Sequence, residues 1–217
     1  VIFNVQIFDD LISYIIISII LGGRFGYIIF YNSSYYFNNP LDIFKIWQGG
    51  MSFHGALIGV ILGTYLFAKK VKVNSFFFLD IIACVAPIGI FFGRVANFVN
   101  SELYGKPSSF FWSVIFPEVD KISRHPSQLY EAMLEGVVLF IILISVVYKK
   151  EIMTGVVSAL FMILYGFFRI IAEQFREPDI QIGYLFDLFS MGSILSFSMI
   201  LIGLFILKKA ANNEFAK

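Results

Sequence analysis

The chain has 217 residues, of which 59% are hydrophobic and 14% are charged, and its formal net charge is +1. A soluble domain would carry about 25% charged residues, so this composition excludes an ordinary globular protein. It indicates an integral membrane protein, which we expect to form one domain over residues 1–217. The nearly balanced charge gives no reason to expect a nucleic-acid partner.

Apolar runs of about 20 residues, the length needed to cross a bilayer as a helix, recur along the chain. We predict spans at residues 11–31, 51–68, 76–98, 128–147, 155–174 and 184–207. The runs are continuous and do not alternate with polar residues, which favours helices over a β-barrel. The predicted fold class is therefore all-α: a polytopic transmembrane helix bundle with six spans.

Lysines predict the orientation of these spans. They follow the second, fourth and sixth spans: Lys69, Lys70, Lys72, Lys149, Lys150, Lys208, Lys209 and Lys217. The positive-inside rule places these ends, and with them the N-terminus, in the cytoplasm. Loops 32–50, 99–127 and 175–183 then face outward. Arg24, Arg94 and Arg169 lie toward the outer ends of their spans, which predicts that they converge at one level.

Glycines repeat at four-residue spacing in three spans, a pattern that lets helix backbones approach closely. The repeats are Gly22/Gly26, Gly55/Gly59/Gly63 and Gly89/Gly93. Because they adjoin polar residues, we expect them to shape the walls of a cavity.

A polar segment ends the third apolar run. A charge at membrane depth costs about 3 kcal/mol or more and is usually kept for a function. Arg94 and Asn97 are three residues apart and share a face if the helix continues that far. This predicts the wall of a polar site inside the membrane protein.

Arg169, Glu173 and Arg176 are spaced i, i+4 and i+7, which predicts that they share one helical face at the end of the fifth predicted span. They could form an ion pair that merely tolerates membrane depth, or a basic cluster that binds a phosphate ester through the planar guanidinium fork. In the fourth span Gln128, Glu131 and Glu135 share a face. The two carboxylates repel each other and need cationic partners from another helix. Arg94 and Arg169 are the candidates.

The chain has two histidines and one cysteine, Cys84. His54 lies among glycines near the outer start of a span and could transfer protons or serve as a packing residue. His125 precedes Pro126, which suits a helix start, so a structural role is favoured there. The histidines lack the spacing of metal ligands, and we expect no metal site and no cofactor.

Five segments carry a family resemblance: residues 22–27, 49–55, 93–105, 124–131 and 165–179. They resemble bacterial prolipoprotein diacylglyceryl transferases, in the family's order and across about nine tenths of the chain. The segment from Gly93 to Gly105 is close to a family signature, which makes the resemblance specific.

The resemblance implies a multi-pass enzyme of the bacterial inner membrane, with its site toward the outer leaflet. Such an enzyme moves the diacylglyceryl group of phosphatidylglycerol onto the lipobox cysteine thiol of a preprolipoprotein and releases glycerol 1-phosphate. By the same resemblance, Arg94 contacts the lipid head group, Arg169 is a second essential arginine, and His54 is the proposed base. Asn97, Glu102 and Gly105 match other functional positions. The proton acceptor, His54 or a carboxylate, stays open.

The remaining candidate substrate-binding residues are Arg24, Glu131, Glu173 and Arg176. Any of Glu102, Glu131 and Glu173 could hold the arginines in place. Guanidinium groups in a site of low dielectric would stabilise the charge of a leaving phosphate.

The sequence departs from the family pattern in two respects. Family members have seven spans, and the first carries a tyrosine that has no counterpart before Leu11; the chain itself begins with Val1 instead of Met. Because the span with this tyrosine is missing, we expect a chain of this form to be inactive or weak. Ala96 and Ser101 also stand where glycine is common.

Two other functions compete with the transferase. Intramembrane arginines could line the path of a small-anion transporter or channel, but the sequence shows no inverted repeat, and its charges cluster toward one face. The chain could also be a truncated relative that only binds lipid or partners. Transfer of labelled lipid to a lipobox peptide would single out the enzyme.

Overall fold

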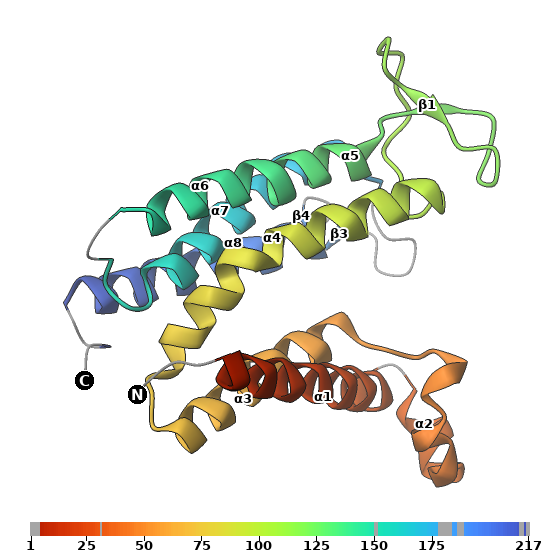
Figure 1. The fold of residues 1–217 in the computed structure, drawn as a ribbon. Helices are drawn as coiled ribbons and strands as arrows, with labels where there is room; N and C mark the ends of the chain where they lie inside the picture. Colours follow the sequence, from red (N-terminus) through yellow and green to blue (C-terminus); the bar gives the residue numbers. More distant parts are fainter. Residues whose placement is uncertain are drawn as a thin grey trace. The chain divides into compact units, whose positions relative to one another are not determined.

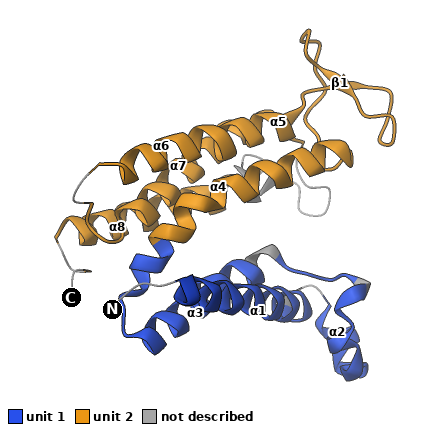
Figure 2. Cartoon of the chain, viewed as in Figure 1, with its two compact units in different colours: residues 1–79 blue, residues 80–217 orange. Residues whose placement is uncertain are grey.

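The computed structural model describes residues 5–30, 32–149, 152–177, 184–185, 189–212 and 215 (Figure 1). The chain divides into two compact units, Val1–Leu79 and Asp80–Lys217 (Figure 2).

Unit 1 is built around two helices. Its elements are α1 (Val5–Phe30), α2 (Ser33–Asn38), the 3₁₀ turns η1 (Pro40–Phe44) and η2 (Ile46–Gln48), α3 (Phe53–Val71) and the start of α4 (Ser75–Val99). A Cβ atom on Gly26 would lie 2.7 Å from the Cα atom of Gly55, and one on Gly22 would overlap the Gly55 carbonyl. The glycines of α1 and α3 therefore allow their backbones to touch, as the spacing predicts.

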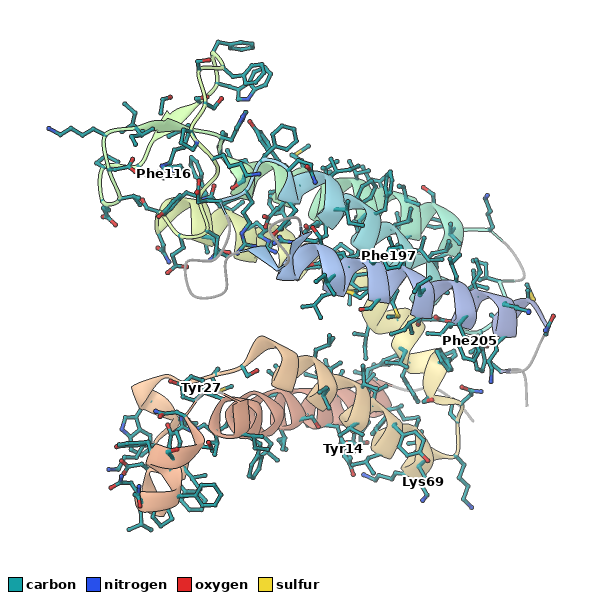
Figure 3. The ribbon with its side chains drawn as sticks, turned by 180° about the vertical axis from the view of Figure 1, so that it is seen from behind. Tyr14, Tyr27, Lys69, Phe116, Phe197 and Phe205 are labelled. Carbon is teal, nitrogen blue, oxygen red and sulfur yellow. The ribbon has the colours of Figure 1, made fainter. Side chains whose placement is uncertain are left out.

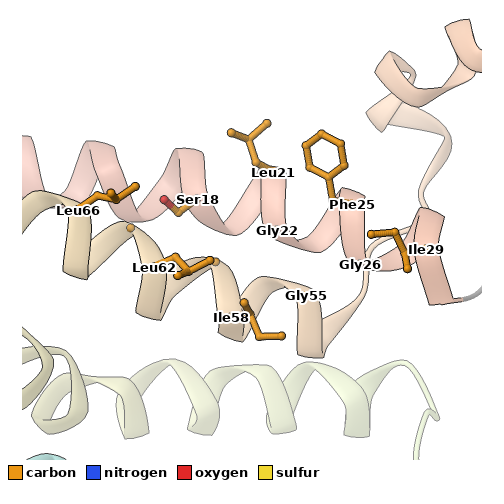
Figure 4. A pocket seen from close by; sticks show the side chains of 12 residues that line it. Ser18, Leu21, Gly22, Phe25, Gly26, Ile29, Gly55, Ile58, Leu62 and Leu66 are labelled. Carbon is orange, nitrogen blue, oxygen red and sulfur yellow. The ribbon is translucent and has the colours of Figure 1, made fainter.

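The same glycines line an apolar groove of about 370 Å³ along α1 and α3 (Figure 4). Gly22, Gly26, Gly55, Gly59 and Gly63 line it together with leucines, isoleucines, Ser18 and Phe25. At the third repeat, a Cβ on Gly89 or Gly93 would meet nothing within 4 Å among the described residues, so the predicted close approach is not seen there. Among the described residues, no neighbouring backbone lies close enough to require a glycine at either position.

Unit 2 is a helix bundle with a hairpin at one end (Figure 1). Its helices are the rest of α4, then α5 (Ser127–Glu131), η3 (Ala132–Val138), α6 (Leu139–Val147), α7 (Val156–Glu173) and α8 (Met191–Ala211). The antiparallel strands β1 (Val114–Ile115) and β2 (Ser123–Arg124) form the hairpin, and β3 (Tyr184–Leu185) pairs with β4 (Phe189–Ser190). The buried core contains Ala83, Cys84, Leu139, Leu143, Val157 and Phe168.

Asp80 joins α4 to the start of α7. Its carboxylate accepts hydrogen bonds from the backbone N–H groups of Gly155 and Ser158, at 2.6 and 2.8 Å, and from the Ser158 hydroxyl at 2.6 Å. These are the donors that a helix N-terminus leaves without an intrahelical partner. Asp80 therefore fixes the end of α7 that lies opposite Arg169.

The helices confirm the predicted class, an all-α polytopic membrane protein. Five helices within the described residues are long and apolar enough to cross a membrane: Val5–Ile29, Ser75–Val99, Ser127–Val147, Val156–Glu173 and Gly192–Ala211. The remaining predicted span, at 51–68, coincides with α3, a helix of 19 residues. Helix α1 begins before the predicted run. Polar residues limit an apolar stretch of sequence, but a helix can continue through them. On α8 (Figure 3), Phe197 and Phe205 are 60% exposed, as suits side chains that face lipid.

Candidate active site

Arg94 and Glu131 form the first ion pair of a buried network in unit 2. Arg94 lies near the C-terminal end of α4 and Glu131 ends α5. The Nε atom of Arg94 is 2.7 Å from Oε2 of Glu131, and its Nη2 atom is 3.5 Å from Oε2 of Glu135. Both glutamate side chains are fully buried. A buried carboxylate requires a charged partner, which Arg94 supplies.

Arg169 reaches the same carboxylate from α7. Its Nη1 atom is 2.9 Å from Oε1 of Glu131 and 3.7 Å from Oε1 of Glu135. Its Nη2 atom is 2.7 Å from Oε2 of Glu173, one helical turn further along. The prediction that Arg94 and Arg169 are the cationic partners of Glu131 and Glu135 is confirmed.

Arg176 joins the network from outside the helix. Helix α7 ends at Glu173, so the prediction that Arg169, Glu173 and Arg176 share one helical face is wrong for Arg176. The chain turns at Gln174, and the backbone of Arg176 pairs with that of Gly105. The buried Arg176 side chain nevertheless places Nη1 4.0 Å from Oε1 of Glu131.

Within the described residues the network contains three arginines and three glutamates, whose formal charges balance. Their side chains are at most 10% exposed, except that of Arg94, which is 17% exposed. An anionic group that approached the network would therefore meet the guanidinium of Arg94 first. The carboxylates hold the guanidinium groups in place before any such group arrives.

The fourth span changes its helical geometry at the network. Between α5 and α6 the backbone forms a π-helix at η3, which contains Glu135. A π turn has more residues per turn than an α turn, and such turns are frequent at functional sites. Gly136 packs against α4, where a Cβ would lie 2.7 Å from the Cβ of Phe91. The close approach of α4 brings Arg94 within reach of both glutamates.

Asn97 and Glu102 form a second polar pair beside Arg94. The Asn97 amide donates to Oε2 of Glu102 at 2.8 Å, and the Glu102 N–H donates to the Asn97 carbonyl at 2.8 Å. Gln128 Nε2 donates to the Glu102 carbonyl at 2.6 Å, and Ser127 Oγ donates to the Leu103 carbonyl at 3.1 Å. The loop after α4 is thereby attached to the first turn of α5.

Gly105 lies where three chain segments cross. Its N–H donates to the His125 carbonyl at 3.1 Å, and the next residue, Lys106, donates its N–H to the Phe175 carbonyl at 2.9 Å. A Cβ on Gly105 would overlap the His125 carbonyl and lie 2.7 Å from that of Phe175. Glycine is required here because the backbone segments at His125 and Phe175 approach it closely. This requirement is independent of any contact between Gly105 and a substrate.

Arg124 secures the base of the hairpin. Its Nη2 atom is 2.7 Å from Oδ2 of Asp120, and its Nη1 atom donates to the Gly105 carbonyl at 3.1 Å and lies 3.3 Å from Oε2 of Glu177. The guanidinium also lies over the Tyr104 ring, 4.8 Å from its centroid. Hydrogen bonding to Arg124 holds the pKa of Asp120 below its usual value of 3.8, and the same hydrogen bond raises the pKa of Arg124.

Arg24, in unit 1, serves as a clamp on the loop between α1 and α3. Its Nε atom donates to the Ile43 carbonyl at 2.9 Å, and its Nη2 atom to Asp42 and Lys45 at 2.6 and 3.2 Å. The Nη1 atom donates to the carbonyls of Gly49 and Gly50 at 2.6 and 3.3 Å. The five N–H groups of the guanidinium are thus all directed to backbone carbonyls.

His54 is the second residue of α3, and its side chain lies outside the described part of the structure. The start of this helix is fixed to α1, because Ser52 donates its N–H to the Gly23 carbonyl at 2.9 Å. Ser52 Oγ also accepts the Gly55 N–H at 3.2 Å as an N-cap. The structure thus brings Arg94, Arg169, Glu131, Glu173 and Arg176 together. Convergence of Arg24 and His54 with them remains a prediction.

His125 contacts aromatic rings, in agreement with the structural role favoured for it. Its Nδ1 atom is 3.1 Å from the Tyr130 hydroxyl, and its ring packs against Phe110 and Phe175. The sequence reasoning assigned no role to Arg124 or Asp80, and it placed Gln128 only on the polar face of the fourth span. Each is a polar residue in or beside an apolar span, and that signal could have marked them.

The fold and this network define a multi-pass membrane protein with a buried arginine–glutamate site at one end of its helices. The sequence model of the family described as "Prolipoprotein diacylglyceryl transferase" matches residues 3–208, and the chain belongs to this family. It is 51% identical over 211 residues to the phosphatidylglycerol–prolipoprotein diacylglyceryl transferase of Rickettsia bellii (strain OSU 85-389), covering 96% of this chain and 80% of the relative. The proteins of the same name from Rickettsia felis and Rickettsia akari are 51% and 50% identical, over 92% and 94% of this chain and 78% and 80% of their own lengths.

Proposed function

We propose that this protein transfers the diacylglyceryl group of phosphatidylglycerol to the lipobox cysteine thiol of a preprolipoprotein. The names of its relatives support the reaction and the lipid substrate. The observation that carries the proposal is the binding of Arg94 and Arg169 to opposite oxygens of Glu131. This arrangement holds two permanent cations together in a buried site, where a phosphate ester is stabilised best.

The reaction balances without a cofactor. The cysteine thiolate attacks the glycerol carbon that carries the phosphate, a C–S bond forms and the C–O bond to the phosphate breaks. The products are a thioether and glycerol 1-phosphate, and the thiol proton passes to a base. Negative charge develops on the departing phosphate, so guanidinium groups held beside it lower the barrier.

Arg94 is the proposed phosphate ligand because it is the most exposed member of the network. Glu131 holds it in place and keeps Arg169 beside it. Glu173 and Arg176 complete the network around Arg169 and Glu131 and hold the substrate through these partners. Their arrangement is complete before substrate binds, so little reorganisation accompanies the reaction.

The other candidate residues shape the surroundings of the network. Asn97 and Glu102 fix the loop that follows Arg94, and Gly105 fixes its crossing with residues 125 and 175. His54 is proposed as the base for the thiol, with a carboxylate as the alternative. Arg24 acts through the loop that leads into α3 and so positions the start of the helix that carries His54.

The proposed location is the bacterial inner membrane, with the network toward the outer leaflet. Lys69, Lys70, Lys208 and Lys209 lie in the last turns of α3 and α8, where the positive-inside rule expects the cytoplasm. Arg94, Glu131 and Arg169 lie at the other ends of their spans. Phosphatidylglycerol of the outer leaflet would then present its phosphate at the level of the network.

The test is transfer of labelled diacylglycerol from phosphatidylglycerol to a lipobox peptide by the purified protein in proteoliposomes. We expect labelling of the cysteine peptide, none of a serine peptide, and a rate about 100-fold lower for Arg94→Gln. Glu118→Gln, which changes an exposed hairpin carboxylate, is the matched control and should retain the rate. Equal rates for Arg94→Gln and the unaltered protein would refute the assignment of Arg94. Labelling of the serine peptide would refute the thiol as acceptor.

A further inference from the structure

The turn that leads into the hairpin of unit 2 carries exposed aromatic side chains that the proposed reaction does not use. Phe110, Phe111 and Trp112, here called the aromatic tip, precede β1, and Phe111 is 92% exposed. Ile115 and Ile122 on the two sides of the hairpin are also exposed. Contiguous exposed apolar surface is uncommon on a protein unless it contacts another molecule or a membrane.

The aromatic tip is held in one arrangement. The rings of Phe110 and Trp112 stack with an interplanar angle of 5° and centroids 5.3 Å apart. The Trp112 indole N–H donates to the Tyr130 hydroxyl at 2.6 Å, and Phe110 packs against His125 with centroids 5.5 Å apart. Phe111 therefore projects from a supported base and not from a loose loop.

The contact between Trp112 and Tyr130 determines the level of the tip. Tyr130 lies in the first turn of the candidate span Ser127–Val147, so its hydroxyl lies near one end of this span. In Figure 1 the loop that leads into β1 bends to the side of the helices of unit 2 instead of continuing along them. A side chain that projects sideways at this depth meets the lipid head-group region.

We infer that the aromatic tip inserts into the head-group region of the membrane that the helices cross, and so anchors the hairpin to the lipid surface. Tryptophan and other amphipathic aromatic residues concentrate at this region, because their rings are apolar and their polar edge stays hydrated. The exposed Lys121 of the same hairpin adds a positive charge that suits anionic lipid head groups. This anchor does not depend on the transfer reaction and would exist in a protein without activity.

Insertion would also stabilise the region beside the ion-pair network. Strand β2 continues through His125 into α5, and Trp112 is bonded to the residue that precedes Glu131. A hairpin fixed at the lipid surface therefore limits movement of the first turn of α5.

Fluorescence tests this inference. The chain has two tryptophans, so Trp47→Phe leaves Trp112 as the only one. This variant is placed in phosphatidylcholine–phosphatidylglycerol vesicles whose phosphatidylcholine carries bromine near the head-group end of its acyl chains. We expect the brominated lipid to lower Trp112 emission about twofold or more, and aqueous iodide to have little effect.

Two further changes in the Trp47→Phe background distinguish the tip from general lipid contact. Phe111→Ser should reduce the quenching by about half or more, and Phe111→Tyr should retain it, since only the first removes the interfacial ring. Tyr148→Ser removes an aromatic side chain that is 83% exposed at the opposite end of the same span, and should change nothing. Because Phe111 and Tyr148 are exposed, neither substitution should prevent folding.

Efficient quenching of Trp112 by iodide, with no effect of brominated lipid, would overturn the inference. Protection from iodide that requires an added lipobox peptide would also overturn it, and would show that the tip binds the protein substrate. Transfer activity is measured separately, so a failed anchor and a failed transferase assignment give different results.

Discussion

Arg94 and Arg169 are held on the two oxygens of a single buried carboxylate, that of Glu131. The Nε atom of Arg94 is 2.7 Å from Oε2, and the Nη1 atom of Arg169 is 2.9 Å from Oε1. Glu131 thus links α4 to α7 through α5. Removal of this one carboxylate would leave Arg94 with Glu135 at 3.5 Å and Arg169 with Glu173 at 2.7 Å, and would leave one buried positive charge without a balancing carboxylate.

Glu131→Gln should therefore be one of the most damaging single changes in unit 2. An amide can accept from one arginine but cannot balance two, and a buried charge that loses its partner costs about 3–5 kcal/mol of stability. The transfer rate should fall about 100-fold or more, because the guanidinium groups lose their fixed positions. Thermal unfolding in detergent and the transfer assay measure the two effects. Unchanged thermal stability would contradict the bridging role, and Glu118→Gln again serves as the control.

Part of this network could be predicted from sequence because the physical constraint is local. Two carboxylates four residues apart in an apolar span must find cations, and arginines at a matching depth were available in other spans. Arg176 was assigned to the wrong element because the end of α7 depends on a distant contact. Its backbone pairs with Gly105, which no helical periodicity reveals.

Arg24 shows the limit of such reasoning more clearly. Like Arg94, it is an arginine in an apolar run, and the sequence gives both the same signal. The partners of Arg24 are backbone carbonyls, which every loop possesses, so no residue type identified them beforehand. The fold class and most of the spans followed from hydropathy, although the predicted span 184–207 began too early, because α8 begins at Met191. The difference between a loop clamp and an ion-pair network depended on the fold.

Ser101 and Ala96, the two positions where the family commonly has glycine, should respond to glycine in opposite directions. Ser101 has φ +57°, in the left-handed region that side chains disfavour, whereas Ala96 lies within α4. Ser101→Gly should raise the free energy of unfolding by about 0.5–1 kcal/mol, and Ala96→Gly should lower it by about the same amount. Thermal melts of the two variants in one detergent compare them directly. Destabilisation by Ser101→Gly would show that its hydroxyl or its ordered backbone outweighs the strain.

Gly105→Ala should disrupt the crossing of the three segments. The new Cβ would overlap the His125 carbonyl, so the loop must move and strain of about 1–3 kcal/mol follows. Displacement of the loop beside Arg94 should reduce the transfer rate about 100-fold even if the protein still folds. Gly89→Ala is the matched control, because a Cβ there meets nothing within 4 Å of the described structure and an alanine favours the helix. Equal activity of Gly105→Ala and Gly89→Ala would contradict the crossing geometry.

The hairpin should lose stability at low pH because Asp120 becomes protonated. Its hydrogen bonds from Arg124 hold the pKa of Asp120 below 3.8, so the folded hairpin favours the ionised carboxylate. A carboxylate whose pKa is lower in the folded state stabilises the fold fully at pH values above its unfolded-state pKa. This stability is lost as the pH falls through its folded-state pKa. Amide exchange of residues 106–124 should thus be constant from neutral pH down to about 4 after correction for the intrinsic rate, and should accelerate below it. Asp120→Asn should exchange faster at neutral pH and lose this acid transition. An acid transition of the same size in Asp120→Asn would assign the titration to another carboxylate.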